Sequence, residues 1–317
     1  MDHQPSFVDL RHVYVDYQPQ SSFLTSLFGR SPHPHSVLRD INLRLNQSDC
    51  VTVFGREGAG KTTLLRLLAG ITAASKGTIH VNGVAPHKVK DLAAGYVSAE
   101  ESEPAHESAF EVLQAFGTTH QITSLPARIG EISDLVQLNS VMHRSARLLS
   151  TAERLRLNLA RAALSDAPLI LLDDTADQLG VLPLKSLLPS LFPNRTIIVA
   201  TRFVATAETL DWPMVLLHQA TLAHLGTCNE IANALACPRI LDVWIEGLRY
   251  DVLRKLRGHP GVIEVRLLPS SRFVGQRLRI IVQSARYLPS VYDIVSQTPL
   301  VRVQELPASL NDILSRL

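Results

Sequence analysis

Alternating hydrophobic and polar side chains predict strands in the first third of the chain. The clearest run is L-R-D-I-N-L-R-L at residues 38–45. Such alternation has the period of a strand with one buried face. Shorter runs rich in β-branched and aromatic residues extend the pattern, and they predict further strands at residues 7–15, 51–54, 78–81 and 95–98.

Two later runs have a different character, because they are apolar almost throughout. They read L-I-L-L at residues 169–172 and T-I-I-V-A at residues 196–200. Runs of this kind are typical of strands that are buried on both faces of a parallel sheet. Helical periodicity occupies residues 62–69 and much of residues 108–164. Strands that alternate with helices predict an α/β fold, a parallel sheet with helices on both faces.

The pattern changes again from about residue 241 onward. Strand-like and helix-like segments follow in the order βαββαβ, the ferredoxin-like arrangement, at residues 242–246, 250–257, 262–268, 277–282, 288–295 and 301–306. A last helix is predicted over residues 310–317, since Ser309 and Asp312 have the spacing of a capping box.

The chain has 317 residues, enough for one large α/β domain and a smaller one. We place the domain boundary near Cys237-Pro238, which predicts a first domain of residues 1–237 and a second of residues 238–317. The Ser- and Pro-rich segment 18–35 is predicted to be a loop.

The overall composition excludes several classes of protein. The net charge is +2, so the total charge does not indicate a nucleic-acid partner, and we expect none. The sequence has no apolar run long enough to span a bilayer, and its start, M-D-H-Q-P-S, does not resemble a signal peptide. Three widely spaced cysteines are expected to be reduced, in a cytoplasmic chain.

The strongest chemical motif is G-R-E-G-A-G-K-T-T, which matches the P-loop pattern G-x-x-x-x-G-K-[ST]. A predicted strand precedes it and a predicted helix follows, so backbone N–H groups, the helix dipole and a lysine together form an anion site. A chance glycine turn before a core helix is the alternative. We expect phosphates to be bound by nine consecutive residues: Gly55, Arg56, Glu57, Gly58, Ala59, Gly60, Lys61, Thr62 and Thr63.

Two carboxylates, Asp173 and Asp174, follow the buried run L-I-L-L. A P-loop protein needs a carboxylate for Mg²⁺ at the end of a buried strand. Asp173 is therefore predicted to bind Mg²⁺ through water, with Thr62 as the hydroxyl ligand. Asp174 lies where a general base would act on the attacking water. In the alternative, the strand simply ends in polar residues.

Further motifs follow the P-loop in a characteristic order. Residues 149–153 read L-S-T-A-E, and R-L-R-L-N-L-A-R-A-A-L comes after them; Asp166-Ala167-Pro168 precedes the L-I-L-L run. In this order and spacing, residues 7–231 resemble the nucleotide-binding subunit of an ATP-binding-cassette (ABC) transporter, whose signature is L-S-G-G-[QE]. The resemblance implies an ABC-ATPase fold with a helical subdomain at about residues 100–165.

The resemblance also implies ligands and partners. ATP and Mg²⁺ would be the cofactors, with Tyr17 stacking on adenine. In the family, two subunits pair head to tail and each ATP lies between the P-loop of one and the signature of the other, which makes Ser150 a nucleotide-binding residue. Separate transmembrane permease subunits would supply the transport pathway.

Several residues depart from the family's pattern at positions that time or catalyse hydrolysis. The catalytic glutamate is replaced by Asp174, one methylene shorter, and the switch histidine by Arg202, which is permanently charged. We expect both residues to be weak catalytically. The other departures are at the Q-loop glutamine, both signature glycines and the D-loop aspartate, where this chain has Ala99, Thr151, Ala152 and Gly180.

These substitutions predict a subunit that binds ATP but hydrolyses it slowly, in a homodimer or with another nucleotide-binding subunit. The ending P-A-S-L-N-D-I-L resembles the P-S-L-E-D-V-F ending of ABC-2 exporters, which favours export. We therefore expect a peripheral protein on the cytoplasmic face of a membrane. A soluble ABC-type regulatory or assembly ATPase and a non-hydrolysing ATP-binding scaffold are the alternatives.

Overall fold

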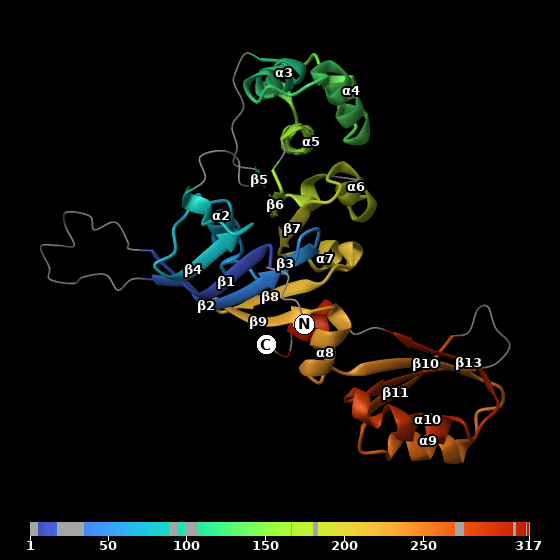
Figure 1. Ribbon diagram of the computed structural model, residues 1–317. Coiled ribbons are helices and arrows are strands. Elements are labelled where there is room, and N and C mark those ends of the chain that lie inside the picture. The colour runs from blue at the N-terminus through green and yellow to red at the C-terminus, as the bar shows by residue number, and fades with distance from the viewer. Residues whose placement is uncertain are drawn as a thin grey trace, which may run out of the picture. The chain divides into compact units, whose positions relative to one another are not determined.

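The chain folds into two compact units, Met1–Leu225 and Gly226–Leu317 (Figure 1). The computed structural model describes residues 6–17, 35–88, 94–98, 107–165, 167–179, 183–269, 276–306, 309–314 and 316. The loop predicted at residues 18–35 lies outside the described residues, except for residue 35.

The division falls earlier than the predicted boundary at Cys237-Pro238. Helix α8 (Cys228–Ala234) belongs to the second unit, because it packs against α11 (Leu310–Leu314) near the end of the chain. Contact between two segments so distant in the sequence leaves no local pattern.

The first unit contains a six-stranded sheet in the order β5-β6-β7-β3-β8-β9. The neighbours from β5 to β8 pair in parallel, as predicted for the buried apolar runs. Its strands are β3 (Cys50–Phe54), β5 (Gly95–Ser98), β6 (Leu169–Asp173), β7 (Thr196–Thr201), β8 (Met214–His218) and β9 (Thr221–Gly226). The sequence analysis did not identify β8 and β9.

A separate antiparallel sheet of the same unit has the order β2-β1-β4, with β1 (Val8–Tyr17), β2 (His35–Leu45) and β4 (Lys76–Val81). Its apolar face and helix α2 (Lys61–Leu68) share one hydrophobic core with the central strands. Leu64, Leu65 and Leu68 of α2 are fully buried in that core. The helix that follows the P-loop is therefore held firmly between the two sheets.

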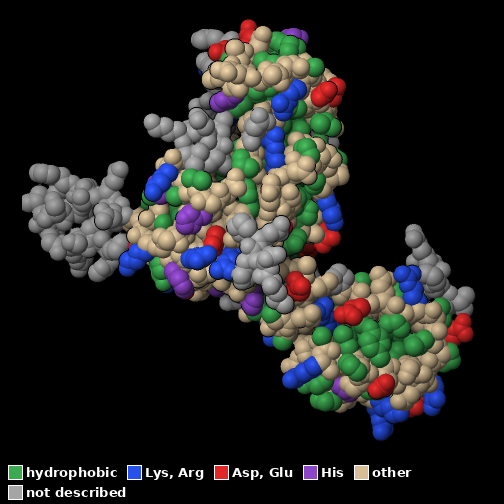
Figure 2. Space-filling view, in the orientation of Figure 1, with side chains coloured by type: hydrophobic (Ala, Val, Ile, Leu, Met, Phe, Trp, Pro, Cys, Tyr) green, Lys and Arg blue, Asp and Glu red, His purple; other side chains and the backbone are tan. Residues whose placement is uncertain are grey.

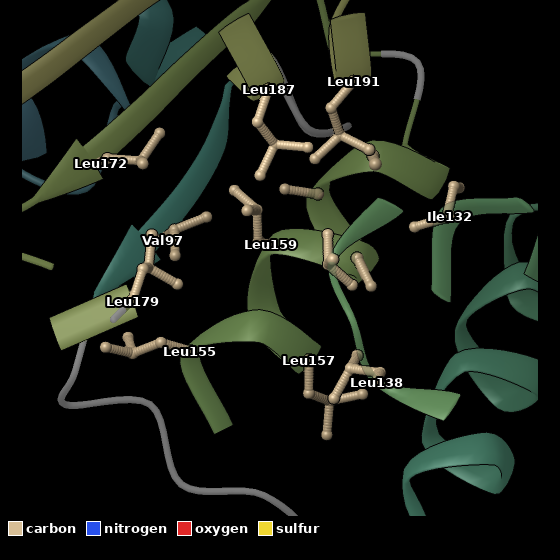
Figure 3. Close-up of a cluster of buried hydrophobic side chains, with 14 of the residues drawn as sticks. Val97, Ile132, Leu138, Leu155, Leu157, Leu159, Leu172, Leu179, Leu187 and Leu191 are labelled. Carbon is tan, nitrogen blue, oxygen red and sulfur yellow. The ribbon is translucent and has the colours of Figure 1, made fainter. Parts of the chain in front are cut away.

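A second core of this unit lies around α5 (Thr151–Leu164). Figure 3 shows Val97 and Leu172, from neighbouring strands, gathered with Leu155 and Leu159 of α5. Two more helices of the predicted helical region, α3 (Ala109–Thr119) and α4 (Leu125–Leu135), pack on α5 and on each other. Two others, α6 (Leu184–Leu191) and α7 (Val204–Leu210), also contribute side chains to this core.

The second unit has the predicted βαββαβ order. It consists of β10 (Arg239–Ile245), α9 (Tyr250–Arg257), β11 (Val262–Leu268), β12 (Gln276–Val282), α10 (Leu288–Val295) and β13 (Leu300–Leu306). The strands form an antiparallel sheet in the order β11-β12-β10-β13, and both helices cover one face of it (Figure 1).

The capping box predicted at the last helix is present. The backbone N–H of Asp312 donates to Ser309 Oγ at 3.2 Å, and the backbone N–H of Ser309 donates to Asp312 Oδ2 at 3.0 Å. On the face drawn in Figure 2, Lys and Arg side chains are interspersed with Asp and Glu on both units. In the part of the chain that the structure describes, no helix is long and apolar enough to cross a membrane.

Candidate nucleotide-binding site

The P-loop connects β3 to α2 as a tight turn of residues 55–60. Gly60 has φ 100°, and a Cβ there would lie 2.6 Å from Leu38 Cδ2 and 2.8 Å from the carbonyl oxygen of Val37. A Cβ on Gly55 would lie 2.6 Å from the carbonyl oxygen of Leu217. Only glycine fits these two positions, so the loop can bring its backbone close to a bound anion.

Lys61 is the first residue of α2, and only 6% of it is exposed. Its Nζ donates to the carbonyl oxygens of Gly55 and Arg56, at 3.0 Å each. Burial lowers the pKa of Lys61, while the carboxylates of Asp174 and Asp173 act in the opposite direction. A buried ammonium at a helix N-terminus is the charge that a phosphate site requires.

The remaining predicted phosphate-binding residues lie in the same turn. The side chains of Arg56 and Glu57 are exposed, whereas Ala59 and Thr63 are buried. Gly58 also has a left-handed backbone, with φ 76°. The charged side chains of this turn are therefore exposed to solvent, whereas Gly55, Ala59 and Gly60 are buried.

Asp173 is the last residue of β6, and it is held on both carboxylate oxygens. Thr62 Oγ1 donates to Oδ1 at 3.0 Å, and the hydroxyl of Tyr96 donates to Oδ2 at 2.6 Å. Burial and this hydrogen bond raise the pKa of Tyr96 above its ordinary value. Carboxylate and hydroxyl oxygens are the ligands that Mg²⁺ prefers, so Thr62 and Asp173 fit the predicted metal position.

Tyr96 was missed as a site residue by the sequence analysis, which used Gly95-Tyr96-Val97 only as a family resemblance. The register of the parallel sheet pairs Val97 with Leu172 and Ser98 with Asp173, so the ends of β5 and β6 meet. A tyrosine two residues before the end of the strand beside the one that carries Asp173 was the available signal.

Asp174 follows Asp173 in a left-handed conformation, with φ 52°. Its backbone N–H donates to the carbonyl oxygen of Ala200 on β7 at 3.1 Å. Its Oδ1 accepts from the backbone N–H of Arg202 at 3.3 Å, and its Oδ2 lies 3.7 Å from Arg202 Nε. The two residues predicted to act in catalysis are therefore paired with each other.

Asp177, which the sequence analysis also missed, lies in 3₁₀-helix η4 (Ala176–Leu179). Burial, followed by the charge of Asp174, raises the pKa of Asp177. Its Oδ2 is buried and accepts no hydrogen bond from the residues that the structure describes. It borders a cavity of about 250 Å³ that Leu184 of α6 and Thr206 of α7 also line. Its place three residues after Asp174 was the only sequence signal.

The signature residue Ser150 is the N-cap of α5. The backbone N–H of Glu153 donates to Ser150 Oγ at 3.3 Å, and the backbone N–H of Ser150 donates to Glu153 Oε2 at 2.7 Å. Thr151, in place of a glycine, is exposed. The contacts of Ser150 within the chain are thus those of a helix cap, separate from the P-loop contacts.

Tyr17, predicted to stack on adenine, ends β1 and is 43% exposed. Its neighbour across the strands is His35 of β2. An exposed ring at a strand end is accessible to a ligand. The altered Q-loop and D-loop positions, Ala99 and Gly180, lie outside the described residues.

Comparison with known proteins identifies the family. The family model described as ABC transporter matches residues 38–177. The Nod factor export ATP-binding protein I of Cupriavidus metallidurans is 30% identical over 237 residues, which cover 70% of this chain and 77% of that protein. The uncharacterized ABC transporter ATP-binding protein YxlF of Bacillus subtilis is 24% identical over 233 residues, 70% of this chain and 78% of that protein.

An importer subunit is also similar. The sulfate/thiosulfate import ATP-binding protein CysA of Pseudomonas aeruginosa is 29% identical over 209 residues, 62% of this chain and 63% of that protein. This chain therefore spans less than two thirds of that relative's length.

Solved structures agree on the fold. An ATP-binding subunit of an ABC transporter superposes with a TM-score of 0.61 at 18% identity, covering 72% of this chain and 93% of that one. A dimeric ATP-binding cassette in a post-hydrolysis state, bound to ADP and Pi, gives 0.57 at 17% identity, covering 69% and 98%.

The chain belongs to the ATP-binding proteins of ABC transporters. Proteins of this family bind ATP with Mg²⁺. They work with transmembrane components and form dimers. The glycine turn, Lys61 and the Thr62–Asp173 oxygens of this chain fit that nucleotide and that metal.

Proposed function

We propose that this chain is the ATP-binding subunit of an ABC exporter, peripheral on the cytoplasmic face of a membrane, and that it binds ATP tightly but hydrolyses it slowly. The observation that carries the proposal is the pairing of Asp174 with Arg202 beside an intact P-loop. Phosphate binding and catalysis use different residues, so one can persist while the other weakens.

The phosphates would be held by residues 55–63, with Lys61 supplying the positive charge. Thr62 and Asp173 would hold Mg²⁺, which when bound neutralises phosphate charge. Asp174 would accept the proton of the attacking water, but its side chain is short and already accepts from Arg202. Loss of a well-placed general base typically lowers the rate by ~10²–10⁴.

Two features support export over import. The ending P-A-S-L-N-D-I-L resembles that of ABC-2 exporters, and one relative with 30% identity is named for export. Importer subunits are also among the relatives, so the resemblance of the ending is the stronger of the two features.

The head-to-tail arrangement of the family sets the partners. Ser150, at the N-terminus of α5, would meet the ATP of a second nucleotide-binding subunit, and the helical region around α3, α4 and α5 would receive the transmembrane permease subunits. A homodimer would have two weakened sites, whereas with a standard partner subunit one site would contain Asp174 and Arg202 and the other would contain the altered signature of this chain.

Melting and turnover of the purified chain test the proposal. Binding to the folded state alone stabilises it by about 2.7 kcal/mol at a hundredfold excess over Kd. We expect Mg-ATP to raise the melting temperature, Lys61→Ala to abolish that rise, and turnover to stay far below ~1 s⁻¹, the low end of ordinary enzymes. Fast turnover that Lys61→Ala abolishes would disprove slow hydrolysis.

Co-purification from the native membrane tests the partners. Recovery of a permease chain with this subunit is expected. Recovery without any membrane chain would favour the alternative function of a soluble regulatory ATPase.

A further inference from the structure

Arg202 joins the P-loop to the ends of two strands of the central sheet. Its Nη1 lies 2.8 Å from Glu57 Oε2, and its Nε lies 3.7 Å from Asp174 Oδ2. The guanidinium also lies over the ring of Phe203, 5.1 Å from its centroid. Glu57 and Arg202 are 145 residues apart in the chain, so only the adjacency of β3 and β7 brings them together.

These charges act on the position where phosphates would bind. Glu57 is part of the turn of residues 55–60 that precedes Lys61, and Arg202 is bonded to its carboxylate at 2.8 Å. A carboxylate in a P-loop repels phosphate, whereas a guanidinium attracts it and can bond it through two N–H groups. While Glu57 is bonded to Arg202, each partner's charge offsets the other.

We propose that Glu57 and Arg202 form a latch that the γ-phosphate of ATP opens, so that this pair sets the preference of the site for ATP over ADP. In the open state Arg202 bonds the γ-phosphate and Glu57 turns to solvent. ADP lacks the group that competes for Arg202, so the latch stays closed over it. This inference rests on the proposed function.

The exposure of the pair allows it to open. The side chain of Glu57 is 85% exposed and that of Arg202 is 42% exposed. An exposed ion pair of this kind favours its closed state over its open state by at most about fivefold. A doubly charged phosphate that bonds a guanidinium through two N–H groups is a stronger partner than one solvated carboxylate, so a bound triphosphate displaces Glu57.

Calorimetric titration with Mg²⁺ and either ADP or a non-hydrolysable ATP analogue tests the latch in the full chain. Glu57→Gln is expected to tighten the analogue by about three- to fivefold and ADP by less than about twofold. Arg202→Gln is expected to weaken the analogue by about tenfold and ADP little, because a charged hydrogen bond is lost only with the triphosphate. In the Arg202→Gln background, Glu57→Gln should increase the affinity for the analogue by less than it does in the wild-type chain.

Asp211→Asn is the matched control. It breaks an exposed ion pair of similar length, Lys185 Nζ to Asp211 Oδ2 at 2.9 Å, and asparagine tolerates the φ of 50° at this position. We expect it to leave both affinities unchanged. Melting temperatures of all variants verify folding.

Two results would overturn the latch. One is an equal effect of Glu57→Gln on the analogue and on ADP; the other is an undiminished gain in the Arg202→Gln background. Either would leave the proposed function intact, since the wild-type chain would still bind nucleotide. A wild-type chain that binds neither nucleotide would overturn the function and the latch together.

Discussion

Replacing Asp174 by glutamate, alone and together with Arg202→His, tests whether the general-base position limits the rate of ATP hydrolysis. The added methylene extends the carboxylate by about 1.5 Å of bond length. A general base within hydrogen-bond reach of water contributes ~10²–10⁴ in rate. We expect the double variant to turn over at least ~10² times faster than wild type, equivalent to about 2.7 kcal/mol of barrier.

Asp174→Glu alone should gain less, since Arg202 Nε lies 3.7 Å from the present carboxylate and would still compete for the new one. It should also destabilise the first unit. Asp174 has φ 52°, which aspartate tolerates through local hydrogen bonds but which costs other residues about 1–2 kcal/mol. In a unit of this size, 1 kcal/mol corresponds to about 2–4 °C in melting temperature.

Phosphate release under saturating Mg-ATP measures the rates, and calorimetry measures the melting. Asp174→Asn is the control, because asparagine keeps the shape and tolerates the left-handed backbone but cannot accept the proton. Unchanged turnover in the double variant, with ATP still bound, would show that the base position does not limit hydrolysis. The limit would then lie elsewhere, such as at the altered signature glycines.

Three further substitutions, two of them with a matched control variant, test other residues. Ser150→Ala removes the capping box of α5, and its control Ser108→Ala removes the equivalent capping box of α3. Each should lower the free energy of unfolding by about 1 kcal/mol. Only Ser150→Ala should weaken the Mg-ATP-dependent dimer, measured by sedimentation. Gly60→Ala should abolish the Mg-ATP melting shift, because its Cβ meets the Val37 backbone, whereas Gly83→Ala, at φ 76° with open space around it, should keep the shift. Asp242, bonded to two arginines, has a lowered pKa, so its contribution to folding is present at neutral pH and is lost as pH falls below about 4, and acid unfolding of Asp242→Asn should lack that step.

The local motifs made much of the fold predictable from sequence. The P-loop, the buried runs at residues 169–172 and 196–200 and the βαββαβ order depend on patterns of a few residues, and the structure has each as predicted. Strand β8, M-V-L-L-H, follows Pro213 after a helical segment and was overlooked, although it is an apolar run of strand length. The separate sheet β2-β1-β4 depends on pairings that no single strand reveals.

The contacts of the site were predictable only in part. The closeness of Thr62 and Asp173 follows from the two motifs, since both were predicted at one magnesium position, but their direct hydrogen bond was not predicted. Tyr96 on Asp173 and Arg202 on Glu57 depend on which strands are neighbours in the sheet, so residue types alone did not predict them. The catalytic and nucleotide-binding roles of the site residues remain predictions that the substitutions above address.

The identity of the nucleotide that stays bound tests slow hydrolysis most directly. The purified chain is incubated with Mg-ATP, separated from free nucleotide at timed intervals and denatured, and the bound nucleotide is separated by chromatography. We expect ATP to be the main bound species over many minutes and the Lys61→Ala variant to retain no nucleotide. Bound ADP within seconds of mixing would mean that the chain hydrolyses ATP rapidly.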